Sequence, residues 1–152
     1  MLLPICTLGT ICPATTSGAW VGAFAGVQWT DTTGRARVSN YWPANTAYTA
    51  GTCVAYFYND INIVYEIQAD GTLAQTSIGD EYPFSNVTVG STTTGLSQCT
   101  LNRASPAAAD ATSQMRVVDI APYPGNDWGD AFTIVRVVNS QSQFFGSFAA
   151  IA

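Results

Sequence analysis

The sequence predicts an all-β protein built from antiparallel strands, and three observations support this fold class. Segments rich in Val, Ile, Thr, Tyr and Phe recur along the chain, separated by turn residues at intervals of roughly 8 to 15 positions. No segment of useful length carries the i, i+3, i+4, i+7 apolar spacing of an amphipathic helix. Residues 51–90 hold four candidate strands separated by turns, which is typical of an antiparallel meander and of one β-propeller blade. The alternatives that we keep are a β-sandwich and a jelly roll.

The expected elements follow from these turns. Residues 1–19 contain Pro, Thr and Gly and are expected to form an extended arm, while residues 20–152 are expected to form a single all-β domain. We expect strands at 20–30, 35–41, 52–58, 61–68, 96–101, 114–120 and 132–139. The segments 42–51, 104–113 and 121–130 are expected to be loops.

Charge and composition exclude several classes of function. The chain has five arginines against ten carboxylates, with no Lys and no His, and a net charge of −5. A balance of this kind disfavours nucleic acid and anionic membranes as partners. Without His or Lys, the usual nucleophilic and acid–base pairs cannot form, so we expect a non-enzymatic protein without a cofactor. The apolar runs are too short for a transmembrane helix, and the N-terminus lacks the basic and apolar regions of a signal peptide.

The four cysteines allow two interpretations. Cys6, Cys12, Cys53 and Cys99 have no C-x-x-C spacing, and no His is present to complete a zinc site. Two disulfides would imply an oxidising location, and Cys6–Cys12 with Cys53–Cys99 is the pairing to test first. Four buried free thiols are the alternative.

The order of the segments resembles the fungal fucose-specific lectin family, whose fold is a six-bladed β-propeller. The inner-strand positions of that family match residues 24–31, 52–59 and 96–103, and its second-strand positions match residues 35–41, 61–67 and 114–120. The resemblance implies a propeller with sugar sites made by Arg, Glu and an aromatic residue. In the best-matching unit these positions hold Asn62, Gln75 and Phe84. Three incomplete units cannot close a propeller alone, so either two chains supply six blades or the units belong to a different β architecture.

Five residues are candidates for carbohydrate binding. Arg37 and Arg116 occupy the Arg position of the resemblance and could bind sugar hydroxyls or a carboxylate; the alternative is an exposed strand Arg that pairs with Asp119 or another acid. Trp42 and Trp128 lie in loops with Pro and Gly, where an indole can stack on a sugar face, and Tyr123 shares the Trp128 loop. The oxygen-rich segment 126–130 lacks calcium-loop spacing and is interpreted as a turn.

Two functions remain after these exclusions. The first is a lectin-like protein that binds a glycan, as the Lys-free, aromatic-rich composition and the family resemblance suggest. The alternative is a structural self-assembling protein, such as a capsid-decorating or filament-forming subunit, because low charge and unpaired strand edges favour association. Both predict a homo-oligomer or an assembly partner, and a location outside the cell or within an extracellular or viral assembly.

Overall fold

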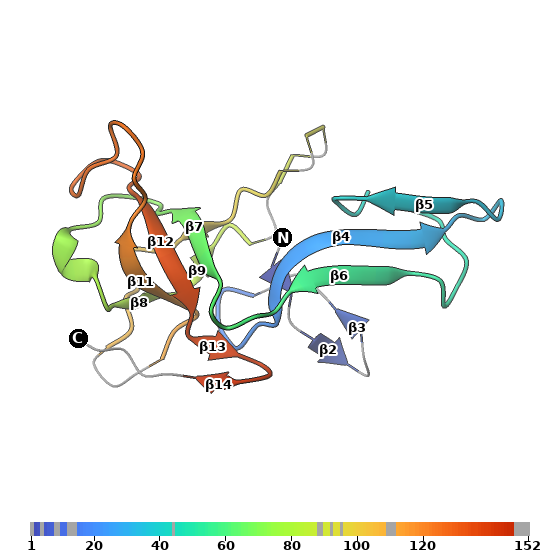
Figure 1. Cartoon of the computed structure of the whole chain (residues 1–152), viewed down its shortest axis with the longest axis horizontal. Coiled ribbons are helices and arrows are strands. Elements are labelled where there is room, and N and C mark those ends of the chain that lie inside the picture. Colours follow the sequence, from blue (N-terminus) through green and yellow to red (C-terminus); the bar gives the residue numbers. More distant parts are fainter. Residues whose placement is uncertain are drawn as a thin grey trace.

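The computed structural model is all-β and antiparallel, as the sequence predicts, and it forms two lobes (Figure 1). The structure describes residues 2–3, 5–7, 10–11, 15–43, 45–87, 90–91, 93–94, 96–108 and 112–147. These residues contain no α-helix, only one short 3-10 helix, η1 (Gln75–Ser77). Within them, no helix has the length and apolar character needed to cross a membrane.

The first sheet is organised around the long strand β4 (Gly22–Thr30). Strand β6 (Val54–Tyr58) pairs with one edge of β4. Strands β5 (Ala36–Ser39) and β1 (Leu2–Leu3) pair with successive parts of the other edge. This sheet extends away from the rest of the molecule (Figure 1).

The second sheet contains four strands in the order β7-β12-β11-β8. Its central strands are β12 (Ile134–Asn139) and β11 (Met115–Ile120), and its outer strands are β7 (Val64–Gln68) and β8 (Glu81–Tyr82). Burial alternates along β12, as expected of a strand with one face on the core. Three short pairs complete the described strands: β9 (Phe84–Ser85) with β10 (Thr100–Leu101), β2 (Ile5–Thr7) with β3 (Thr10–Ile11), and β13 (Gln141–Ser142) with β14 (Gly146–Ser147).

The meander expected in residues 51–90 is wrong in its strand pairing. β6 pairs with β4 in the first sheet, whereas β7 pairs with β12 in the second. The segment between them, residues 59–63, therefore crosses from one lobe to the other and is not a hairpin turn. An alternating pattern indicates a strand but does not name its partner, because any strand of matching face can pair with it.

The main core lies on the inner face of the second sheet. Trp20 is fully buried there, with its ring 5.4 Å from Phe84 and 5.6 Å from Tyr65. The other buried core residues are Ala69, Leu73, Tyr82, Leu101, Met115, Val117, Val135 and Val137. Because β4 starts two residues after Trp20, this side chain fixes the first sheet to the core of the second.

A buried amide closes the same core. The Gln114 side chain accepts a hydrogen bond from the Phe84 amide at 2.9 Å and donates to the carbonyls of Thr15 and Gly18 at 3.1 and 3.0 Å. Residues 15–18, within the expected N-terminal arm, are thereby held against the core. A buried amide is stabilising only when its donors and acceptors are satisfied, as they are here.

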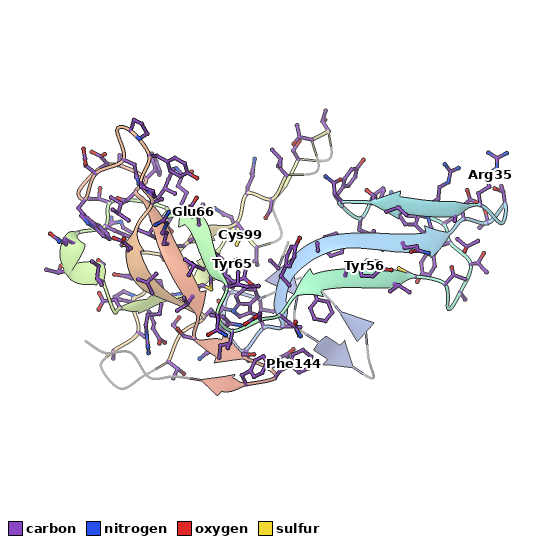
Figure 2. All side chains as sticks on the ribbon, in the orientation of Figure 1. Arg35, Tyr56, Tyr65, Glu66, Cys99 and Phe144 are labelled. Carbon is purple, nitrogen blue, oxygen red and sulfur yellow. The ribbon has the colours of Figure 1, made fainter. Side chains whose placement is uncertain are left out.

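The expected pairing of Cys53 with Cys99 is wrong, because both are free thiols. Cys53 is exposed beside β6 in the first sheet, whereas Cys99 packs against the core of the second lobe (Figure 2). Burial raises the pKa of the Cys99 thiol to about 11, so it stays protonated near neutral pH. The expected Cys6–Cys12 pair lies outside the residues whose side chains are described.

One ion pair is buried enough to matter for stability. The Glu81 carboxylate is fully buried, accepts the Ser113 amide at 2.7 Å and pairs with Arg116 at 2.9 Å. Removing one partner of a buried pair leaves an uncompensated charge.

We therefore expect Arg116→Met to lower the free energy of unfolding by about 3 kcal/mol. Urea denaturation followed by circular dichroism measures this loss. Arg37→Met is the matched control, since it breaks an exposed ion pair and should cost far less. Equal losses in the two variants would contradict the importance assigned to the Glu81–Arg116 pair.

Candidate functional site

The distal end of the first sheet brings two of the predicted carbohydrate-binding residues together. Trp42 packs edge-on against Trp29, 5.3 Å between ring centroids, and against Tyr48 at 5.6 Å. In the register of β4 and β5, Trp29 lies opposite Arg37. Arg37, Trp42 and Tyr48 thus share one face of the sheet with Asp31, and we name these four residues the Trp42 cluster.

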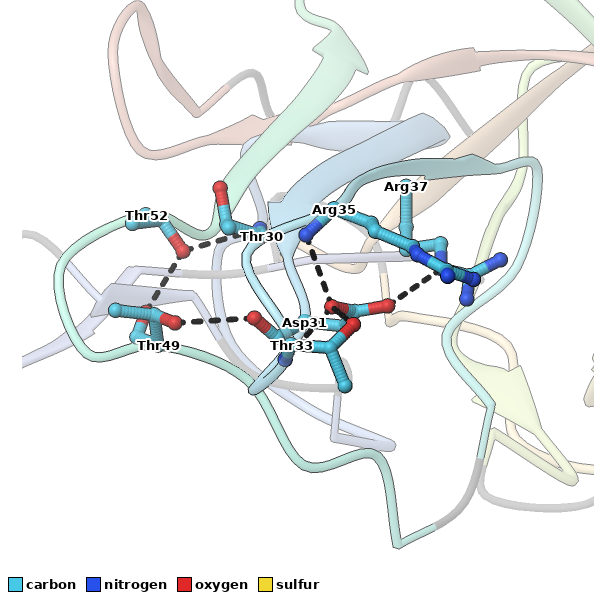
Figure 3. Close-up of polar contacts among 7 residues, drawn as sticks. All are labelled: Thr30, Asp31, Thr33, Arg35, Arg37, Thr49 and Thr52. Carbon is cyan, nitrogen blue, oxygen red and sulfur yellow. Dashed lines mark hydrogen bonds and ion pairs between the residues drawn. The ribbon is translucent and has the colours of Figure 1, made fainter.

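Asp31 organises this end of the sheet through both carboxylate oxygens (Figure 3). Its Oδ1 accepts the Thr33 hydroxyl at 2.6 Å and the amides of Thr33 and Arg35 at 2.9 and 3.0 Å. Its Oδ2 accepts Nε of Arg37 at 2.9 Å. The hydrogen bond from Thr33, the Arg35 amide and Arg37 all lower the pKa of Asp31 well below its usual range.

A network of threonines attaches the following loop to the hairpin. The Thr49 amide donates to the Thr30 carbonyl at 2.8 Å, and the Thr49 hydroxyl donates to the Asp31 carbonyl at 3.2 Å. The Thr52 hydroxyl donates to Thr49 and accepts the Thr30 amide. Figure 3 shows the contacts made by the Thr49 and Thr52 hydroxyls. Together with the bridge between Asp31 and Tyr48, these contacts hold Tyr48 beside Asp31. The Trp42 cluster is therefore preorganised, with an aromatic surface next to an ion pair.

The other three predicted residues lie in the second lobe. Arg116 is committed to the buried Glu81, so its side chain has a structural role. Trp128 is half-buried against the core. Tyr123, in the same loop, is half exposed, and its hydroxyl donates a hydrogen bond to Glu66. The segment 126–130 contains a turn, as expected, in which the Asp130 amide donates to the Asp127 carbonyl at 3.1 Å. The side-chain amide of Asn126 donates to the carbonyls of Ala121 and Ile134, both at 2.8 Å.

A second surface, which we name the outer groove, does not follow from the sequence pattern. It is an open groove of about 720 Å³ on the outer face of the second sheet, lined by Val64, Tyr65, Glu66, Val118, Asp119 and Arg136. Glu66 pairs with Arg136 at 3.2 Å and accepts the Tyr123 hydroxyl. These contacts lower the pKa of Glu66, and that carboxylate raises the pKa of Tyr123. Strand alternation indicates outward side chains at positions 66 and 136, but only the β7–β12 pairing reveals that they meet.

The third notable surface is the exposed face of the first sheet, formed by Val38, Val54, Tyr56 and Tyr58. Their side chains are 78, 50, 50 and 60 % exposed, respectively. The Tyr56 hydroxyl bonds to Gln28 at 3.3 Å across the same face. The opposite face is covered, since Val27 and Trp29 are only 2 and 8 % exposed. This asymmetry leaves a row of large apolar side chains facing solvent.

The described residues contain no group of three or more His, Cys, Asp or Glu that could hold a metal ion. Comparison of the chain with models of protein families, with curated proteins and with solved structures finds no match. The function is therefore inferred from the three surfaces described above.

The low pKa of Asp31 has a testable consequence. A carboxyl whose folded pKa is depressed contributes stability that is fully present above its unfolded pKa of about 3.9. For Asp31 that contribution declines as pH falls below this value and is gone once pH has fallen through the lower folded pKa. We expect the amide resonances of Thr33 and Arg35 to stay unchanged in an NMR titration from neutral pH down to about 3.9. Thr33→Ala, which removes the largest cause of the shift, should raise the pH at which the Arg35 amide resonance moves. A transition in the wild type well above that pH would contradict the hydrogen bonding shown in Figure 3.

Proposed function

We propose that the chain is a structural, self-assembling protein that associates through the exposed face of the first sheet. The observation that carries this proposal is the row Val38, Val54, Tyr56 and Tyr58, each half or more exposed on a sheet whose other face is covered. Scattered apolar residues are ordinary on a protein surface, whereas a contiguous patch on one face is typical of an interaction site.

The edges of the same sheet support the proposal. In the described part of the chain, β5 and β6 each pair only with β4, so both present unpaired backbone groups. Natural proteins commonly protect such edges with Lys, and this chain has none. A weakly charged, Thr-rich surface fits a subunit of an extracellular or viral assembly, such as a capsid-decorating or filament-forming protein.

The test is the oligomeric state as a function of concentration. We expect wild-type protein to form oligomers in sedimentation velocity, and Tyr56→Asp to weaken association roughly tenfold or more, because a charge replaces an aromatic contact. Ile78→Asp is the matched control, since Ile78 is an exposed apolar residue of the second lobe. A wild-type monomer at the highest soluble concentration would overturn the proposal, as would equal effects of the two substitutions.

A second candidate function is glycan binding at the Trp42 cluster. The supporting observation is that Trp42 and Tyr48 lie beside the Arg37–Asp31 ion pair on one face. An aromatic surface can contact the apolar C–H side of a sugar, while the remaining Arg37 donors can bind its hydroxyls. The predicted residues Arg37 and Trp42 would then act together, while Arg116 and Trp128 would not take part.

Saturation-transfer NMR with a panel of neutral oligosaccharides tests this second function. We expect weak binding of at least one member, and its loss in Tyr48→Ala and in Arg37→Gln. Arg103→Gln removes an arginine of the second lobe and should leave binding unchanged. Signals that persist in Tyr48→Ala and Arg37→Gln, or no binding by any member at millimolar concentration, would contradict this function.

A further inference from the structure

The N-terminal and C-terminal parts of the chain, divided after residue 58, carry opposite net charge. Residues 1–58, which include the first sheet, hold two arginines and one aspartate, for a net charge of +1. Residues 59–152, which include the second sheet, hold three arginines and nine carboxylates, for a net charge of −6. This asymmetry makes a head-to-tail contact between two copies electrostatically more favourable than a contact between their two acidic parts.

The first lobe presents an arginine whose guanidinium forms no ion pair among the described residues. Arg35 lies exposed at the tip of the β4–β5 hairpin (Figure 2). The ion pairs of the described residues involve Arg37, Arg116 and Arg136, and the Arg35 guanidinium is in none of them. The Arg35 amide is bonded to Asp31, so the backbone that carries this side chain is fixed.

The outer groove of the second lobe contains an acidic side chain, Asp119, that could pair with this arginine. Glu66 is occupied by Arg136 and by Tyr123, whereas Asp119, which also lines the groove, forms no ion pair among the described residues. One Asp119 oxygen accepts the Ile120 amide at 2.8 Å. Val64 and Val118, which are 51 and 37 % exposed, supply apolar surface in the same groove.

We propose that the outer groove receives the β4–β5 hairpin tip of a second copy of this chain, with Arg35 of one copy beside Asp119 of the next. Val38, on the exposed face of the first sheet, would then contact the apolar part of the groove. This inference rests on the proposed self-assembly and adds which surface meets which. Because the two surfaces differ, the contact is heterologous and repeats from copy to copy, so it builds a ring or an open chain rather than a two-fold dimer.

A charge swap tests the inference by sedimentation velocity with the full chain. We expect Arg35→Glu and Asp119→Arg each to weaken self-association about tenfold or more, because each places like charges together. The double variant Arg35→Glu/Asp119→Arg should recover most of the wild-type association. Arg103→Glu is the control, since it makes the same change of charge at an exposed residue that does not line the groove. Association should also weaken as salt is raised.

The outcomes separate this inference from the proposed function. A wild-type monomer would overturn both. Association that Tyr56→Asp weakens, but that Arg35→Glu leaves unchanged, would overturn the head-to-tail contact and leave self-assembly standing. Equal losses in Arg35→Glu and Arg103→Glu, or a double variant no better than either single one, would also overturn the contact.

Discussion

The burial of Trp20 is the constraint on which the two-lobed arrangement depends. Its indole packs against Phe84 and Tyr65, its amide donates to the Gln141 carbonyl, and its carbonyl accepts the Gln143 amide. The chain then enters β4 at once, where Gly22 lies so close to the Tyr58 carbonyl that an added Cβ would sit 1.7 Å from that oxygen. Among the described residues, these contacts fix the base of the first sheet to the second lobe.

This attachment explains why the surfaces of interest lie where they do. A sheet is usually covered by a second layer of helices or strands. In the described part of the chain, the strands of the first sheet pair only with one another. The loop with Trp42 and Tyr48 packs on one face, while the face with Tyr56 stays open. In the second lobe the inner face is filled by the core, so the charged row of Glu66, Arg136 and Asp119 is left on the outside. Both candidate contact surfaces are therefore sheet faces that the described residues leave uncovered.

The sequence predicted the fold class and most strand positions, because alternation and turn residues are local signals. It failed on pairing: β6 and β7 follow one another in the chain but belong to different sheets. For the sites, alternation alone could not separate Arg37, which is exposed, from Arg116, which is held by a carboxylate with no solvent exposure. That distinction depends on Glu81, which reaches Arg116 only through the β8–β11 pairing.

The pairing of β7 with β12 also has a consequence for the order of folding during synthesis. The pairing of β4 with β5 joins residues close in sequence and can form as soon as both strands leave the ribosome, whereas β7 must wait for a partner from much later in the chain. Until then Tyr65 and Ile67, which pack against the finished core, have no sheet to join. The nascent chain therefore exposes an apolar strand that has no partner yet. A chaperone that shields extended apolar segments would be of most use in this interval.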